Sequence, residues 1–356
     1  MSFIREKLKI GKLNVQEIKY EENNGNSPSI KMPAFSISYK LVLDIILGTL
    51  IIFPFLLYKA VERMFMKPIS IKGKICLVTG AGRGLGRELC IKLANLGATI
   101  VCVDIRQEIN DETVKIIKDS GGKACGYICN VAKYEEVMEL AVKVQNEVGR
   151  VYLLVNNAAL IMTHKAGEWL PQEVISMFNV NVISHYWTIQ SFLPAMKEAN
   201  DGHIVSILSI SAVSGIPGFS VYGATKAAGE NLLCSLRTEL NSNKDNNIKL
   251  TGIYPTAFDS SADHNNLIDV NLLRTGILEM EAVVAATIEA ILYGKTCVSV
   301  PGPLYYFMQF TKFLPHVMVE KMYDILNMNI NVPNQTYKES IPFNDIVNKC
   351  VETKRL

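Results

Sequence analysis

The stretch Thr79-Gly80-Ala81-Gly82-Arg83-Gly84-Leu85-Gly86 decides the fold of this chain. The short apolar run Ile75–Thr79 leads into it, and residues Gly84–Leu96 follow with helical spacing. Glycines between a strand and a helix allow a tight turn, and the free N–H groups and dipole of the helix start attract a phosphate. The sequence therefore predicts a phosphate-binding loop formed by Gly80, Arg83, Gly84, Leu85 and Gly86.

Strand and helix patterns alternate downstream of this loop. A second predicted strand, Thr99–Val103, ends at Asp104. The further predicted strands are Ala124–Cys129, Val151–Val155, His203–Leu208, Lys249–Tyr254 and Cys297–Val300, and the helices between them include Glu135–Val148, Val174–Glu198 and Tyr222–Leu240. This alternation is typical of a parallel sheet with helices on both faces. We therefore expect one α/β domain over residues 74–300, with a Rossmann-type doubly wound sheet.

The acidic residue at the end of the second strand bears on the choice of cofactor. Asp104 follows Gly80 by 24 residues, the spacing at which a carboxylate accepts hydrogen bonds from the adenosine ribose of a dinucleotide. A carboxylate there also repels a 2′-phosphate, which favours NAD. Arg83 and Arg106 are cations that could reach such a phosphate, so NADP stays open.

The composition excludes several classes of function. The net charge of +2 with 20% charged residues is ordinary, and no basic stripe with interleaved aromatics indicates a nucleic-acid partner. Eight cysteines form no CxxC pair and no zinc-like cluster with histidine, so we expect no metal. They are typical of buried thiols in a reducing compartment, with a disulfide or metal role as the alternative.

The region before the enzyme domain has two parts. Residues 1–38 are polar and predicted to be disordered. Within a predicted anchor at 39–66, residues 41–58 read LVLDIILGTLIIFPFLLY, close to the ~20 residues that span a bilayer. The run starts too late for a cleaved signal peptide. Asp44 and Pro54 leave a spanning helix, a hairpin and a buried core helix as alternatives.

Basic residues follow the apolar run more densely than they precede it. Lys59, Arg63 and Lys67 are among them, and the positive-inside rule then places the downstream domain in the cytosol. Beyond the domain, residues 301–356 form an apolar, amphipathic extension. Its part 303–328 fits a surface-lying helix, a substrate entrance or a helix packed on its own domain.

Five motifs in sequence resemble the short-chain dehydrogenase/reductase family over residues 74–300. The glycine loop matches TGxxxGxG, and Asn156-Asn157-Ala158-Ala159 matches NNAG except for its last residue. Asn181 lies where the family has a helix-borne asparagine. Ser209 precedes Tyr222 by 13 residues, and Tyr222 with Lys226 matches YxxxK. The resemblance implies an NAD- or NADP-dependent oxidoreductase with catalytic Asn181, Ser209, Tyr222 and Lys226.

The chemistry of these residue types agrees with the resemblance. Tyr222 and Lys226 are i and i+4 on a predicted helix and face the same way. A phenol has an unperturbed pKa near ~10, and a nearby ammonium and a positive nicotinamide would lower the pKa of Tyr222. Tyr222 then serves as general acid/base and Ser209 orients the substrate oxygen. The resemblance implies that Lys226 holds the nicotinamide ribose and that Asn181 positions a water.

The resemblance also carries over to further cofactor contacts. Asn130-Val131 stands where an Asp-Val pair touches the adenine, and Asn157, Ala158 and Ala159 stand beside the cofactor. The methyl group of Ala159 replaces a glycine hydrogen there. Pro255 precedes Thr256 where a Pro-Gly turn is usual, and Ser260 replaces a threonine that contacts the carboxamide. Tyr222 and Lys226 complete this set.

The apolar N-terminal segment and the C-terminal extension are similar to the membrane-associated branch of retinol and 17-beta-hydroxysteroid dehydrogenases. This resemblance implies a lipophilic alcohol, ketone or aldehyde as substrate, of the retinoid, steroid or fatty-alcohol class. It also implies contact with membrane lipid at the endoplasmic reticulum or lipid droplets, and a homodimer formed through the helices of Asn181 and Tyr222. The alternatives are an NADPH-dependent reductase of a long-chain keto lipid and a non-enzymatic membrane binding module.

Overall fold

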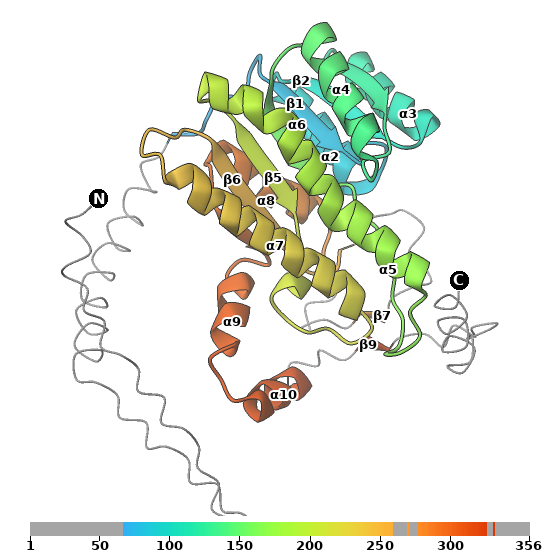
Figure 1. Cartoon of the computed structure of the whole chain (residues 1–356), viewed down its shortest axis with the longest axis vertical. Coiled ribbons are helices and arrows are strands. Elements are labelled where there is room, and N and C mark those ends of the chain that lie inside the picture. The colour runs from blue at the N-terminus through green and yellow to red at the C-terminus, as the bar shows by residue number, and fades with distance from the viewer. Residues whose placement is uncertain (1–66, 259–268, 271–276, 326–329, 332–356) are drawn as a thin grey trace, which may run out of the picture. The chain divides into compact units, whose positions relative to one another are not determined.

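The computed structural model describes residues 67–258, 269–270, 277–325 and 330–331, which belong to the unit Met66–Leu356. Within these ranges, parallel strands form a seven-stranded sheet in the order β3-β2-β1-β4-β5-β6-β8 (Figure 1). The strands are β1 Ile75–Thr79, β2 Thr99–Asp104, β3 Lys123–Ile128, β4 Val151–Asn156, β5 His203–Ile207, β6 Lys249–Pro255 and β8 Cys297–Val300. The predicted α/β doubly wound fold is confirmed.

Helices cover both faces of this sheet, as Figure 1 shows. The first face carries α2 Gly84–Asn95, α3 Gln107–Asp119 and α8 Met280–Leu292, and the second carries α4 Tyr134–Glu147, α6 Ser184–Ala199 and α7 Ser220–Asn241. Successive strand residues point to opposite faces. Val78 of β1 accordingly packs with Leu89 of α2, and its neighbour Leu77 with Phe192 of α6. Two-sided burial explains why these strands are continuous apolar runs.

The order of the strands reverses beside β1. Its neighbours are β2 on one side and β4 on the other, both parallel to it. In such sheets ligands bind outside the carboxyl ends of the strands at this switch point. The residues that follow β1 and β4 are the glycine loop and Asn157, so the fold brings these two motifs together.

The helix expected over Val174–Glu198 is divided in the structure. It consists of α5 Pro171–Phe178, a π-helical turn Asn179–Ile183 and then α6. The side chain of Asn181 accepts a 2.8 Å hydrogen bond from the N–H of Leu160 and donates to its carbonyl at 2.9 Å. A single-turn π bulge is frequent at functional sites, and these contacts with the chain after β4 account for its place.

The C-terminal part adds short elements to the domain. Helix α9 Leu304–Thr311 packs inward through Tyr305 and Met308, and α10 His316–Ile325 follows. Strands β7 Asp269–Val270 and β9 Ile330–Asn331 pair antiparallel. None of the helices in the described part of the chain is both long and apolar enough to cross a bilayer. The predicted polar segment 1–38 and the predicted anchor 39–66 lie outside the described residues.

Candidate active site

The glycine loop between β1 and α2 has the shape that a phosphate-binding turn requires. Gly80 and Gly84 have φ angles of +66° and +54°, a region that favours glycine. A Cβ atom on Gly86 would lie 2.0 Å from the carbonyl oxygen of Gly80, closer than any side chain permits. Backbone therefore approaches backbone here, and the N-terminus of α2 opens toward the turn.

Asp104 at the end of β2 is held by two backbone amides. Its Oδ2 accepts a 2.9 Å hydrogen bond from the N–H of Gly82, and its Oδ1 accepts one of 3.0 Å from the N–H of Arg106. The residue is buried. A carboxylate offers about four lone-pair positions, so the two amides fix its orientation and leave acceptor capacity for a ligand hydroxyl.

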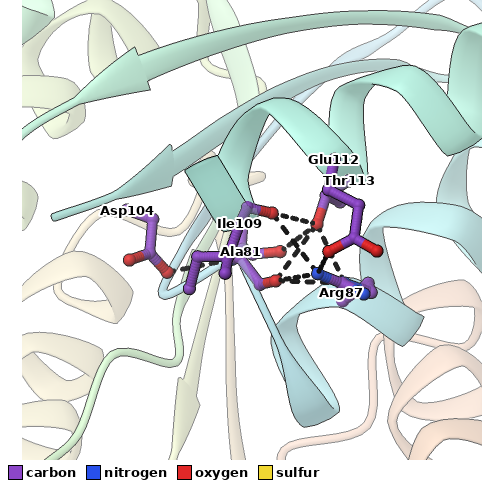
Figure 2. A network of polar contacts seen from close by, with 7 residues as sticks. Ala81, Arg87, Asp104, Ile109, Glu112 and Thr113 are labelled. Atoms are coloured by element: carbon purple, nitrogen blue, oxygen red, sulfur yellow. Dashed lines mark hydrogen bonds and ion pairs between the residues drawn. The ribbon is translucent and has the colours of Figure 1, made fainter. Parts of the chain in front are cut away.

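A polar cluster that sequence reasoning missed supports the loop from behind. Arg87 of α2 and Thr113 of α3 hydrogen-bond to the carbonyl groups of Ala81 and Gly82 (Figure 2). Thr113 is one of two polar residues, with Asn110, among the four buried residues of α3.

Thr79 ties the ends of β1 and β4 together and was also missed as a site residue. Its hydroxyl oxygen accepts hydrogen bonds from the N–H groups of Asn157 at 3.0 Å and Ala158 at 3.1 Å. The Asn157 amide donates in return to the carbonyl of Thr79 at 2.9 Å and that of Gly80 at 3.2 Å. These contacts fix the NNAA segment beside the glycine loop.

The two motifs line a common cavity of about 590 Å³. Most of the predicted cofactor contacts lie on its wall, together with Arg106. They are Gly80, Arg83, Gly84, Leu85, Gly86, Asp104, Asn130, Val131, Asn157, Ala158 and Ala159. A glycine turn, a helix N-terminus and a carboxylate around one cavity fit a dinucleotide, with the pyrophosphate at the turn.

The remaining predicted contacts differ in position. Asn130 accepts a 3.1 Å hydrogen bond from the N–H of Ala132, so its side chain also shapes the turn before α4. Pro255 pairs in register with Val300 at the end of β6 and does not line the cavity. Ser260 lies outside the described residues. In the part of the chain that is described, no cluster of histidine, cysteine or acidic side chains could hold a metal ion.

Ser209, Tyr222 and Lys226 form a second group, which does not line this cavity. The Nζ atom of Lys226 lies 5.5 Å from the centroid of the Tyr222 ring and donates a 2.8 Å hydrogen bond to the carbonyl of Ile207. Both side chains are buried. Ser209 follows β5, and its Oγ accepts a 3.2 Å hydrogen bond from the N–H of Ser211.

Burial dominates the proton affinities of this group. It lowers the pKa of Lys226 to about 8 because the charged ammonium is desolvated. It raises the pKa of Tyr222, and the hydrogen bond with Ser209 lowers that pKa by less. The predicted lowering of the Tyr222 pKa is therefore not a property of the protein alone, since desolvation outweighs its neighbours.

Asn181 stands between the cavity and the Tyr222 helix. Besides its bonds to Leu160, its Nδ2 donates a 3.0 Å hydrogen bond to the Oγ1 of Thr225, which lies next to Lys226 in α7. Its neighbours Asn179 and Val180 line the cavity. The π-helical turn thus connects the wall of the cavity with the helix that carries the tyrosine and lysine.

Comparison with known proteins agrees with these motifs. The short chain dehydrogenase family profile matches residues 74–271. Short-chain dehydrogenase/reductase family 16C member 6 of Bos taurus is 39% identical over 60% of this chain and 69% of its own. Epidermal retinol dehydrogenase 2 of Homo sapiens is 35% identical over 69% of this chain and 80% of its own length. The human 17-beta-hydroxysteroid dehydrogenase 13 is 30% identical over 82% of this chain and 96% of its own length.

Solved structures are similar as well. A 7 alpha-hydroxysteroid dehydrogenase complexed with NADH and 7-oxo glycochenodeoxycholic acid has 25% identity and a TM-score of 0.59, over 65% of this chain and 95% of its own. A metagenomic short-chain oxidoreductase in complex with NADP has 23% identity and a TM-score of 0.54, over 65% of this chain and 96% of its own. The second likeness is one of fold alone.

Proposed function

This chain belongs to the short-chain dehydrogenase family and is an oxidoreductase of CH–OH groups that uses NAD or NADP, and from this premise we propose a more specific function. The protein is a membrane-anchored dehydrogenase that transfers a hydride between NAD(H) and a lipophilic alcohol, ketone or aldehyde. Its catalytic residues are Ser209, Tyr222, Lys226 and Asn181.

One observation carries the proposal: the buried Lys226 ammonium lies beneath the buried Tyr222 ring. A surface pair at i and i+4 would leave both groups in water. Here the lysine pKa is about 8, so Lys226 is mostly protonated at neutral pH. A positive charge in a desolvated place interacts strongly with a phenolate, which is the form that Tyr222 needs to accept a proton.

Each residue then has a defined task. In the oxidative direction Tyr222 takes the hydroxyl proton of the substrate as general base, and in the reductive direction it returns that proton. Ser209 donates a hydrogen bond to the same substrate oxygen. Lys226 stabilises the phenolate, and Asn181 holds the loop of Leu160 against α7. A nicotinamide cofactor, when bound, would supply or accept the hydride.

The preference for NAD over NADP is supported by Asp104. Its buried carboxylate lines the cavity, where it would accept hydrogen bonds from the adenosine ribose and repel a 2′-phosphate. Arg83 and Arg106 line the same cavity, and this supports a second candidate, an NADPH-dependent reductase of a long-chain keto lipid. The relative affinity for NADH and NADPH separates the two.

The lipophilic substrate class is supported by the surroundings of Tyr222. Its ring packs in an apolar cluster that includes Met177, Ile210, Phe219 and Met308. A substrate that reaches the Tyr222 hydroxyl would contact these apolar side chains, and apolar walls with few polar groups are usual for sites that bind lipophilic molecules. The relatives named for retinol and 17-beta-hydroxysteroids point in the same direction.

Attachment to a membrane is supported by the apolar segment 41–58. With it we propose the order of a polar segment at 1–38, an anchor at 39–66, a catalytic domain at 74–300 and an extension at 301–356. The domain faces the cytosol at the endoplasmic reticulum or a lipid droplet. A homodimer forms through the helices of Asn181 and Tyr222, which is supported by the exposed apolar side chains of Ile183 and Tyr186.

The test is turnover by the full-length protein in lipid vesicles. The substrates are all-trans-retinol, a 17-beta-hydroxysteroid, a long-chain alcohol and a small water-soluble alcohol, each with NAD and with NADP. Turnover of a lipid substrate with NAD that is lost in Tyr222→Phe supports the proposal. Turnover of the small alcohol alone contradicts it.

A further inference from the structure

Arg87 holds the back of the phosphate loop at a single carbonyl group. Its Nη2 and Nε atoms both donate to the carbonyl oxygen of Gly82, at 2.6 Å and 3.0 Å (Figure 2). The Nη2 atom also lies 2.7 Å from Glu112 Oε2 on α3. The guanidinium fork is a rigid, charged donor, so it fixes the direction of the Gly82 carbonyl more firmly than a neutral donor would.

Thr113 joins the loop to α3 from the other side. Its hydroxyl accepts a 3.1 Å hydrogen bond from Arg87 Nε and lies 3.0 Å from the carbonyl oxygen of Ala81, to which it donates. The N–H of Ala81 donates in turn to Val103 of β2 at 3.0 Å. The peptide groups of Ala81 and Gly82 are therefore held by α2, α3 and β2 together.

Gly82 connects this cluster to Asp104. Its carbonyl accepts from Arg87 while its N–H donates to the Asp104 carboxylate. A Cβ atom on Gly82 would lie 2.8 Å from Asp104 Oδ2 and 2.5 Å from a side-chain atom of Ile109, so the loop has little room to shift. The N–H of Gly82 shares its peptide group with the carbonyl of Ala81, to which Thr113 donates. Arg87 donates to the hydroxyl of Thr113 and, across the Cα atom of Gly82, to the next carbonyl. A shift of either contact therefore redirects one of the two amides that orient Asp104.

We propose that Arg87 is a positioning residue that sets both the affinity for NAD and the discrimination against NADP, acting through Gly82 on Asp104. Arg87 is absent from the lining of the cavity, so its effect on a bound cofactor would be indirect. The inference rests on the proposed function in one respect: Asp104 faces the adenosine ribose. A loop released from Arg87 presents its amides less well to the pyrophosphate, and a reoriented Asp104 repels a 2′-phosphate less.

The test measures the dissociation constants of NADH and NADPH by fluorescence on the full-length protein. Arg87→Met removes donors to a carbonyl, worth about tenfold in NADH affinity. NADPH binding should weaken less, so the ratio of the two constants shifts toward NADPH. Arg87→Lys should lie between, because an ammonium cannot reproduce the fork. Lys92→Met is the matched control, since it removes an exposed ion pair with Glu281 from the same helix.

A second set of measurements separates positioning from general stability. Thr113→Val keeps the side-chain volume. It should change the dissociation constants of NADH and NADPH in the same direction as Arg87→Met does, by a smaller factor. In Arg87→Met the KM for NAD should rise while kcat at saturating NAD changes by less than about twofold. Unchanged NADH binding in both variants overturns the inference, and so does an equal loss of NADH and NADPH.

The outcomes also distinguish this inference from the proposed function. A wild-type protein that binds NADPH more tightly than NADH contradicts the proposed cofactor preference. A wild-type protein that prefers NADH, with variants that keep the same ratio, contradicts the role of Arg87 alone.

Discussion

Lys226 Nζ lies 5.5 Å from the centroid of the Tyr222 ring, while its hydrogen bond runs to the carbonyl of Ile207. The ammonium is thus anchored by the end of β5 and not by the phenol oxygen. Its position is fixed by the sheet, and its charge remains available to the phenolate that forms during turnover. The pair also sets how stability and activity depend on pH.

Removal of the phenol hydroxyl tests the proton-transfer role. Tyr222→Phe keeps the ring in its apolar cluster, so folding and NADH binding should remain. The value of kcat/KM should fall by about 100-fold or more, the usual contribution of a positioned general acid/base. Tyr127→Phe is the control, because it removes a tyrosine hydroxyl that bonds Glu147 at the surface. Equal activity in the two variants would show that Tyr222 is not the acid/base.

The buried ammonium should lower stability below pH 8. The pKa of Lys226 is about 8 in the folded protein and 10.5 for an unperturbed lysine. Between these pH values the unfolded chain binds more protons, so wild-type stability rises with pH there by up to about 3 kcal/mol. Lys226→Met lacks this term, and its stability relative to wild type should be greatest below pH 8 and fall by that amount toward pH 10.5.

Urea unfolding of both proteins at several pH values measures this difference. Other titrating groups, including the buried cysteines, are present in both and cancel in the comparison. A difference between the two proteins that stays constant from pH 7 to pH 10 would mean that Lys226 keeps its proton in the folded protein over this range, so that burial does not lower its pKa.

Much of the fold was predictable because burial on both faces leaves a direct mark on sequence. Strands such as Val151–Asn156 are buried throughout and read as continuous apolar runs. The glycine loop was equally predictable from the sequence. Gly80 and Gly84 have positive φ angles, and Gly86 lies too close to the backbone of Gly80 for any side chain. Eleven of the predicted cofactor residues line one cavity.

Other features depend on contacts between distant segments and leave no such mark. The π-helical turn at Asn179–Ile183 has a side-chain period close to that of an α-helix, and its place is set by Leu160. The role of Arg87 depends on α3, which lies beyond the next strand. Burial of Tyr222 likewise follows from tertiary packing, and this is why its pKa is raised where sequence reasoning expected a lower value.

The close approach at Gly86 predicts a severe effect of a single methyl group. In Gly86→Ala the new Cβ meets the carbonyl oxygen of Gly80, so the loop must move or α2 must tilt. We expect a loss of about 1–3 kcal/mol in unfolding free energy and a weaker affinity for NADH. Gly215→Ala is the matched control, because nothing lies within 4 Å of its Cβ position. Wild-type NADH binding by Gly86→Ala would remove the loop from the cofactor site.

The charge of Asp104 should decide between the two cofactors. Asp104→Asn removes the negative charge. It also puts an NH₂ donor in place of one of the two carboxylate oxygens that accept from the amides of Gly82 and Arg106. NADH should bind about tenfold more weakly, whereas NADPH should bind as well as before or better. Asp111→Asn makes the same charge change on the exposed side of α3. If it shifts the preference equally, the effect is one of net charge and not of the site.

The buried histidine of α6 should make the protein sensitive to acid. Neither ring nitrogen of His185 has a hydrogen-bond partner among the residues that the structure describes. Burial, together with the charge of Lys226, lowers the pKa of His185 from 6.5 to about 3. The unfolded chain therefore takes up a proton at this residue below pH 6.5 while the folded protein does not. Wild-type stability falls in that range, by about 2 kcal/mol at pH 5.

His185→Met removes this term, so its stability relative to wild type should rise by that amount between pH 7 and pH 5, as measured by urea unfolding. His203 has a pKa lowered to about 3 by burial as well, but it is present in both proteins and cancels. A relative stability that does not change over this range would show that His185 is protonated in the folded protein, which would place a second positive charge beside Lys226.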